Sequence, residues 1–145
     1  MTVIVTGATS FIGRAVVKAL LEEGCRVVAV SRPASAGAGK LQELFEDLKK
    51  QAGAEKKVFG SLELCFCELG EIEKLEKIYK KEELQAKAWL HLGWDGAGSD
   101  KRKDVKLQEK NIGYACSLFT QQRLLDANAF CFPVPRQNTG SVMNG

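Results

Sequence analysis

The stretch that decides the fold is Thr2-Val3-Ile4-Val5-Thr6, followed at once by Gly7-Ala8-Thr9-Ser10-Phe11-Ile12-Gly13. The first five residues predict a buried strand, and the glycine-containing segment predicts a tight turn that leads directly into an amphipathic helix. A helix that begins in this way points its unpaired backbone N–H groups and the positive end of its dipole at one place. The sequence therefore predicts a binding site for an anion such as a pyrophosphate.

The residues that follow complete a strand–helix–strand unit. Apolar side chains recur at the spacing of one helical face, namely at Ile12, Ala15, Val16, Ala19 and Leu20. Gly24 is placed to end this helix, and residues 26–30 then form a run that is typical of parallel strands covered on both faces. Because such a unit is right-handed and contains the glycine turn, it strengthens the prediction of a phosphate site.

The rest of the chain repeats this alternation of helices and strands. We expect a helix over residues 41–48, a polar loop over 51–57, a strand over 62–69, a helix over 72–79, a strand over 86–92, and one long helix or two consecutive helices over 99–127. The side of this last region that we expect to face inward carries Val105, Ile112, Ala115, Leu118, Phe119 and Leu125. Pro133 and Pro135 disfavour a buried strand beyond Phe132. The predicted fold is a three-layer α/β sandwich with a parallel sheet in the order 3-2-1-4, helices on both faces, and a fifth strand that is missing or degraded.

Composition limits the number of domains and the classes of partner. The 145 residues, 45% hydrophobic and 27% charged, fit one globular domain over residues 1–130 and an irregular tail over 131–145. A net charge of +3 without a basic stripe argues against a nucleic-acid-binding protein. No apolar stretch approaches the roughly 18 residues needed to cross a bilayer and no signal peptide opens the chain, so we expect a cytoplasmic protein without a membrane partner.

The cysteines and the single histidine favour structural roles. The cysteines, Cys25, Cys65, Cys67, Cys116 and Cys131, are best explained as small buried apolar residues in a reducing compartment. Cys65 and Cys67 share one face of a predicted strand, but a single histidine leaves a closed metal site without enough ligands, so we expect no metal. His91 lies inside an apolar strand, where a hydrogen-bonded core residue is more common than a catalytic one.

The end of the second predicted strand decides which dinucleotide is expected. A dinucleotide-binding fold places the group that contacts the adenosine ribose here, commonly a carboxylate for NAD or an arginine for the 2′-phosphate of NADP. Ser31 and Arg32 stand at this point, and residues 30–34 contain no carboxylate. We therefore expect NADP in preference to NAD, with Arg32 paired to the phosphate; the alternative is an arginine that is simply solvated at a strand end.

Two features near the end of the fourth predicted strand are compatible with more than one role. Gly93 allows a ligand to approach the backbone closely, and Trp94 beside it either lines a pocket or covers the sheet. The cluster Lys101-Arg102-Lys103 opposes the dipole of the helix that follows. It is either a solvated cluster or an anion site that faces the substrate.

Five short segments follow one another in a characteristic order. They are the turn from Thr6 to Gly13, Ser31-Arg32-Pro33, Glu68-Leu69, His91-Leu92-Gly93-Trp94, and Asn111-Ile112. From Met1 to about Phe130, this set resembles the extended short-chain dehydrogenases/reductases, and among them the NAD-dependent epimerase/dehydratase family. The resemblance implies a Rossmann-type fold that binds a dinucleotide. It also implies an oxidoreductase or isomerase that acts on a small-molecule substrate, largely a nucleotide sugar, and that is often a homodimer.

The resemblance further implies which residues bind the cofactor. The first turn, which includes Thr9, would bind the phosphate side of the cofactor. Gly7 would make the tight bend, and Gly13 would let the helix pack close to the strand. The pyrophosphate and ribose would be lined by Ser10, Phe11 and Ile12. Arg32 would bind the adenosine phosphate, and Glu68 and Leu69 would lie beside the adenine. Leu92 and Gly93 would pass the centre of the cofactor, and Asn111 matches an asparagine next to the active site.

The chain also departs from the family pattern. Ser10 stands where the family usually has glycine, and Glu68 stands where it has aspartate. The catalytic serine and the Tyr-x-x-x-Lys pair have no counterpart, because the only tyrosines, Tyr79 and Tyr114, are followed four residues later by Glu83 and Leu118. We therefore assign no catalytic residue and expect the cofactor-binding portion of a longer enzyme, cut short or diverted near Phe130, which is not catalytic as this chain. The alternatives are a non-enzymatic NADP-binding sensor or interaction module, and a non-functional truncated fragment.

Overall fold

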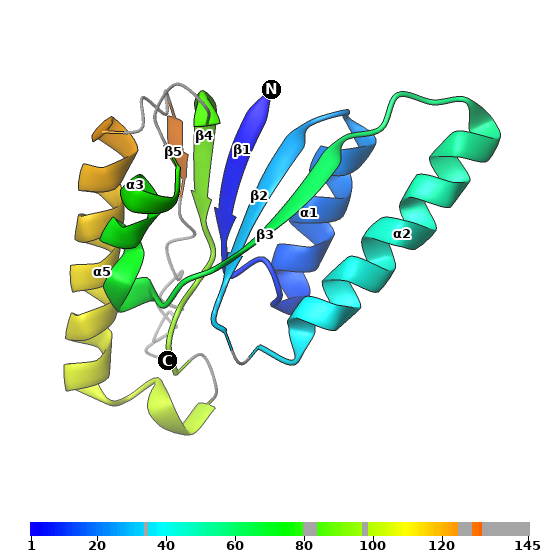
Figure 1. Ribbon diagram of the computed structural model, residues 1–145. Coiled ribbons are helices and arrows are strands. Elements are labelled where there is room, and N and C mark those ends of the chain that lie inside the picture. The colour runs from blue at the N-terminus through cyan, green and yellow to red at the C-terminus, as the bar shows by residue number, and fades with distance from the viewer. Residues whose placement is uncertain (34, 80–83, 97–98, 125–128, 132–145) are drawn as a thin grey trace, which may run out of the picture.

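The protein is built around a parallel β-sheet with helices on both faces (Figure 1). The computed structural model describes residues 1–33, 35–79, 84–96, 99–124 and 129–131. The strands are β1 (Thr2–Thr6), β2 (Arg26–Ser31), β3 (Ser61–Phe66), β4 (Ala86–His91) and β5 (Ala129–Cys131). Their order across the sheet is β3-β2-β1-β4-β5, which confirms the predicted order 3-2-1-4.

The fifth strand is present at the edge of the sheet. Residues Ala129, Phe130 and Cys131 pair in parallel with Ala88, Trp89 and Leu90 of β4. The sequence analysis expected this strand to be missing or degraded, and a strand of three residues fits the second of these descriptions. β5 also includes Cys131, which the sequence analysis assigned to the tail, whereas Pro133 and Pro135 lie outside the described residues.

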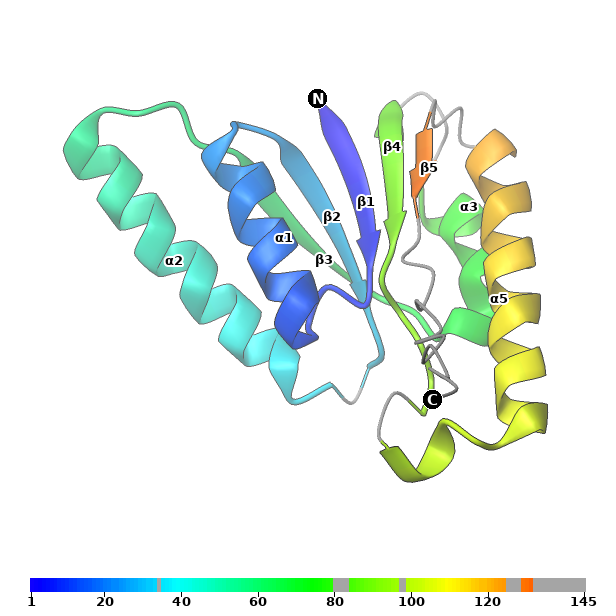
Figure 2. The ribbon, with the colours of Figure 1, turned by 180° about the vertical axis from the view of Figure 1, so that it is seen from behind.

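Two layers of helices cover the sheet. One face carries α1 (Phe11–Glu22) and α2 (Gly37–Glu55). The other carries the 3-10 helix η1 (Leu69–Lys74), the short helix α3 (Leu75–Ile78) and the long helix α5 (Val105–Leu124), as the two opposite views show (Figures 1 and 2). A second 3-10 helix, η2 (Ser99–Lys101), precedes α5.

The sheet is buried on both faces because the middle positions of its central strands β1 and β2 form continuous apolar runs. In β2, Val28 and Val30 pack into the core beneath η1 and α5, whereas Val27 and Ala29 pack into the core beneath α1 and α2. All four side chains are at most 1% exposed. Burial of one such valine stabilises the fold by about 1.5–3 kcal/mol, so the continuous run 27–30 supports both layers at once.

Strand register brings the carboxyl ends of the central strands to one level. Thr6, at the end of β1, pairs with Val30 of β2 on one side and with His91 of β4 on the other. The loops that follow β1, β2 and β4 therefore leave the sheet at the same edge. In open α/β sheets this edge is where ligands bind.

Helix α2 is longer than the sequence analysis predicted. Residues 51–55, which we expected in a polar loop, continue the helix to Glu55, and Lys56 ends it in a left-handed conformation with φ 53°. The apolar periodicity stops near Leu48, which is buried, but the next residues still have the propensity to form a helix. Because this last turn is solvated, it carries no apolar face from which the sequence could predict it.

Helix α5 turns a different face to the sheet from the one expected. Leu118 is fully buried and Ala115 is partly buried, as predicted, but Val105, Ile112 and Phe119 are 68%, 58% and 52% exposed. The inward face instead carries polar residues, above all Asn111, which is 1% exposed. The predicted inner face is therefore wrong at Val105, Ile112 and Phe119, and Leu125 lies outside the described residues.

The cysteines follow the prediction at three positions and depart from it at a fourth. Cys25, Cys65 and Cys67 are buried with free thiols, but Cys116, on the outer side of α5, is exposed. Cys116 lies between Ile112 and Phe119 in the sequence, and the rotation of α5 that exposes those two residues exposes it as well.

Candidate functional site

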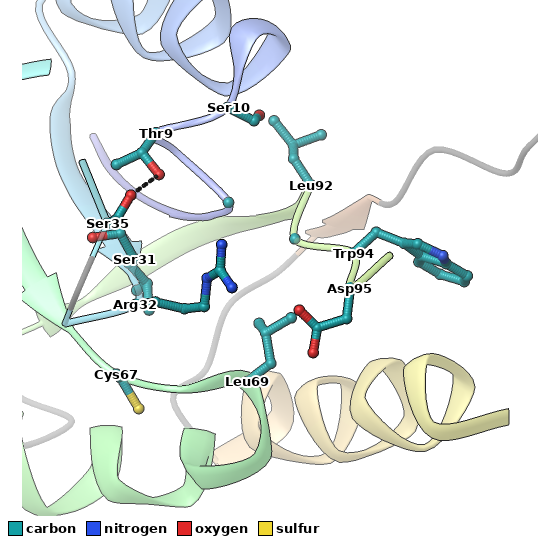
Figure 3. Close-up of a pocket in the computed structure, with 13 residues that line it drawn as sticks. Thr9, Ser10, Ser31, Arg32, Ser35, Cys67, Leu69, Leu92, Trp94 and Asp95 are labelled. Carbon is teal, nitrogen blue, oxygen red and sulfur yellow. Dashed lines mark hydrogen bonds between the residues drawn. The ribbon is translucent and has the colours of Figure 1, made fainter. Parts of the chain in front are cut away.

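A pocket of about 320 Å³ opens at the carboxyl ends of β1, β2 and β4 (Figure 3). Of the residues that the sequence analysis proposed, those lining it are Gly7, Thr9, Ser10, Arg32, Leu69, Leu92 and Gly93. They come from segments that are far apart in the sequence, and the parallel sheet brings them together at its edge.

The glycine turn forms the floor of the pocket because the chain packs there without side chains. Gly7 has φ +70°, and a Cβ at this position would stand 2.5 Å from the backbone nitrogen of Gly93. A Cβ on Gly13 would overlap the carbonyl oxygen of Gly7. The backbone of the turn therefore lies directly against the start of α1 and the end of β4, and only glycine fits at either position.

Ser10 begins α1 as its N-cap residue. Its Oγ accepts a hydrogen bond from the backbone N–H of Gly13 at 3.0 Å, which satisfies one of the free donors at the helix start. Ser10 thus caps the helix while it lines the pocket. Its own O–H remains available to donate to an anion at the helix start.

Polar side chains after β2 form the wall on one side of the pocket. Arg32 extends into the pocket, and the hydroxyl of Ser35 donates to Thr9 Oγ1 at 2.9 Å (Figure 3). Within the described residues, the buried Oγ of Ser31 has no hydrogen-bond partner. A cation beside several hydroxyl groups matches what a phosphate needs, and an unpaired buried hydroxyl is costly unless a ligand or water satisfies it.

The opposite wall is formed by the loop after β4, which two side chains of α5 hold in place. The backbone N–H of Asp95 donates to Asn111 Oδ1 at 2.9 Å, and Asn111 Nδ2 donates to the carbonyl oxygen of Asp95 at 2.9 Å. Trp94 Nε1 donates to Gln108 Oε1 at 2.8 Å, and Gln108 Nε2 donates to the carbonyl oxygen of Lys101 at 3.2 Å. The buried Asn111 thus fixes the loop rather than lining the pocket itself.

Four of the proposed residues lie outside the pocket lining. Phe11 and Ile12, in the first turn of α1, are 84% and 63% exposed, and Gly13 is buried where α1 meets the glycine turn. Glu68 has an exposed side chain and precedes η1 without capping it. The structure therefore places Leu69, but not its neighbour Glu68, at the pocket.

The buried titratable groups near the pocket are held in their neutral forms. Burial lowers the pKa of His91 to about 4, and His91 Nδ1 lies 2.6 Å from Thr6 Oγ1 in a hydrogen bond between neighbouring strands. Burial, reinforced by the nearby Cys65 and Glu71, raises the pKa of the Cys67 thiol to about 11. His91 is 2% exposed and does not line the pocket, so it is a core residue, and Cys67 lines the pocket as a protonated thiol rather than as a nucleophile.

Several residues at the pocket escaped the sequence analysis as site residues. Ser31, Ser35, Cys67, Trp94 and Asp95 all line it. Ser31 and Trp94 were considered without being assigned. Asp95 lies in the loop that follows β4, and a place in such a loop is the signal that could have identified it. The cluster Lys101-Arg102-Lys103 is exposed and is not part of the lining. In the described part of the chain, no group of three or more His, Cys, Asp or Glu side chains could hold a metal ion, and no helix is long and apolar enough to cross a membrane.

Comparison with known proteins identifies the family and the fold. The NAD dependent epimerase/dehydratase family model matches residues 3–133. Over 77 residues, or 53% of this chain, the sequence is 38% identical to divinyl chlorophyllide a 8-vinyl-reductase, chloroplastic, from Arabidopsis thaliana, of which it covers 16%.

Solved structures share the fold at low sequence identity. UDP-glucose 4-epimerase from Thermotoga maritima, solved with UDP-glucose, is 21% identical with a TM-score of 0.66, covering 91% of this chain and 37% of that one. UDP-glucose 4-epimerase from Stenotrophomonas maltophila, solved with NAD, is 18% identical with a TM-score of 0.67, covering 91% and 36%. Gre2 from Candida albicans, solved with NADPH, is 23% identical with a TM-score of 0.58, again covering 91% and 36%.

The chain thus spans little more than a third of the length of these solved structures. The family match, by contrast, extends over nearly all of the chain itself. The chain therefore belongs to the NAD-dependent epimerase/dehydratase family.

Proposed function

We propose that this chain binds a nicotinamide dinucleotide in the pocket at the carboxyl edge of the sheet, with NADP preferred to NAD. The observation that carries the proposal is the combination of the glycine turn with Arg32 in one pocket. The turn brings bare backbone and the start of α1 to the pocket floor, where a pyrophosphate is favoured. When bound, the dinucleotide would supply a nicotinamide ring for hydride transfer.

The preference for NADP rests on the end of β2. The carboxylate that often binds the ribose of NAD is missing from residues 30–34, and Arg32 stands in its place. Guanidinium pairs with phosphate through charge-assisted hydrogen bonds, and the hydroxyl groups of Ser31, Ser35 and Thr9 surround the same region (Figure 3). These groups favour the extra 2′-phosphate of NADP over a free ribose hydroxyl.

We also propose that the chain supplies the cofactor-binding portion of an oxidoreductase or isomerase that acts on a nucleotide sugar. Support comes from the family membership and from the two UDP-glucose 4-epimerases that share the fold over 91% of this chain. The same chain covers only 36–37% of those structures, so catalytic residues would come from a further part of the protein.

A homodimer is the assembly that we propose. The outer stripe of α5, defined here as Val105, Ile112 and Phe119, places three exposed apolar side chains at intervals of seven residues. Residues at this spacing lie along one side of a helix and suit pairing with a second copy of the same helix.

The proposed cofactor is tested by titrating the purified chain with NADPH and NADH while its thermal stability is followed. NADPH at a hundred times its dissociation constant should stabilise the chain by about 2.7 kcal/mol. Arg32→Ala should weaken NADPH binding by about tenfold or more and leave NADH binding unchanged, because the lost charge-assisted contact is worth about 1.5–3 kcal/mol. Lys50→Ala, which removes an exposed cation from α2 outside the pocket, is the matched control. An unchanged ratio of the two affinities in Arg32→Ala would overturn the assignment to NADP.

A further inference from the structure

The pocket contains a second charged side chain, Asp95, whose presence the phosphate groups of a dinucleotide do not explain. Its carboxylate points into the pocket from the loop after β4, toward Arg32 on the opposite wall (Figure 3). Among the described residues the carboxylate makes no hydrogen bond or salt bridge, since both hydrogen bonds of Asp95 come from its backbone, although it attracts the exposed ammonium of Lys110 on α5 at longer range. The pocket is therefore cationic on the β2 side and anionic on the β4 side.

The carboxylate of Asp95 is held in a fixed position. Asn111 bonds both the N–H and the C=O of Asp95, and Asn111 is itself 1% exposed, so the backbone on either side of this Cα is clamped to α5. Gln108 holds the preceding residue, Trp94, to the same helix. A side chain whose backbone is fixed in advance loses less entropy when it binds a ligand.

The chemistry of a carboxylate selects the group that it can bind. An ionised carboxylate only accepts hydrogen bonds and repels phosphate, so its partners are hydroxyl groups or cations. In the proposed orientation of the dinucleotide, Arg32 takes the adenosine phosphate and the glycine turn takes the pyrophosphate. Of the hydroxyl groups of the dinucleotide, those of the second ribose remain for the β4 side.

We propose that Asp95 binds the ribose hydroxyls of the nicotinamide half of the dinucleotide, and that Asn111 is the residue that positions it. This inference rests on the proposed function, and it assigns the β4 side of the same pocket. It makes Asp95 a recognition residue for the half of the ligand that carries the reactive ring. Arg32 then binds the adenosine half, so each of the two charged side chains binds one half of the dinucleotide.

The test compares the wild-type chain with Asp95→Asn, which removes the charge at nearly constant size, for three ligands. These are NADPH, NADP⁺, and adenosine 2′,5′-bisphosphate, which lacks the nicotinamide half. We expect Asp95→Asn to weaken the binding of NADPH and of NADP⁺ by about tenfold each. A hydrogen bond to a charged group strengthens binding by about this factor more than a neutral hydrogen bond does. Binding of adenosine 2′,5′-bisphosphate should change by less than about twofold. Asp47→Asn, an exposed carboxylate on α2, is the matched control.

Each other result counts against the assignment. Equal losses of affinity for all three ligands would mean that Asp95 stabilises the whole pocket and does not bind one ribose. No loss of affinity for any ligand would mean that Asp95 does not bind the dinucleotide. A loss confined to NADP⁺ would mean that the carboxylate pairs with the positive nicotinamide ring instead of the ribose. A wild-type chain that binds none of the ligands would overturn the proposed function itself. Asp95→Ser, which also removes the carboxylate, serves as the second variant in the same titrations.

Discussion

Replacement of His91 by asparagine should change how the stability of this protein depends on pH. His91 is buried with a pKa of about 4, whereas its ordinary value is 6.5. Between these values the unfolded chain binds a proton that the folded chain does not, so the free energy of unfolding falls as the pH is lowered from about 6.5 to 4. At 1.36 kcal/mol per unit, the difference of 2.5 units amounts to about 3 kcal/mol.

Asparagine does not titrate in this range, and its amide oxygen still offers an acceptor for the hydroxyl of Thr6. His91→Asn will be less stable than the wild type at pH 7.5 because the buried ring is lost. This deficit should shrink by about 3 kcal/mol when the pH is lowered to 4. Urea unfolding of both proteins at half-unit steps of pH measures the difference, and the carboxylates common to both cancel. Two stability curves that run parallel from pH 7.5 to 4 would refute the assignment of His91 as a buried neutral base.

Two further predictions concern packing and assembly. Gly13→Ala should destabilise the fold by about 1–3 kcal/mol and abolish NADPH binding, because the added Cβ overlaps the carbonyl oxygen of Gly7. Gly39→Ala in α2, where an added Cβ meets nothing within 4 Å, should instead stabilise the fold by about 0.5–1 kcal/mol. Thermal unfolding and NADPH titration of both variants distinguish these two outcomes. Ile112→Lys, in the outer stripe, should sediment as a monomer where the wild type sediments as a dimer. The monomeric variant should still unfold at a melting temperature no lower than that of the wild-type monomer. Ala54→Lys, on an exposed face of α2, should leave the dimer intact, and equal masses for all three proteins would argue against pairing through α5.

The fold was predictable where local pattern and tertiary burial agree. A parallel strand that is covered on both faces is a continuous apolar run, and residues 27–30 show this in the sequence itself. Gly7 and Gly13 were likewise recognisable, because the turn between a strand and a helix needs both the unusual backbone conformation and the close approach that they provide. The end of α2 was missed because its last turn contacts solvent and carries no periodic apolar signal.

The site was predictable only in part because some of its residues act through contacts across the fold. The face of α5 was misassigned from its apolar residues, since Asn111 is turned inward by hydrogen bonds to a loop sixteen residues earlier in the chain. Asp95 acquires its orientation from the same contact, so no local pattern around it signals a fixed carboxylate. Arg32 could be assigned to the pocket from its place after β2, because that place is common to the fold.

Helix α5 has two faces with different properties, and this has a consequence for regulation. Its inner face fixes Trp94 and Asp95 at the pocket, and the side chains of its outer stripe are more than half exposed. A partner that shifts the helix would alter the position of the pocket wall, and a ligand that draws the wall inward would alter the helix. Such energetic coupling is reciprocal, so the factor by which pairing changes ligand affinity is also the factor by which the ligand changes pairing. The concentration of the protein would then become a variable that tunes its response to the dinucleotide.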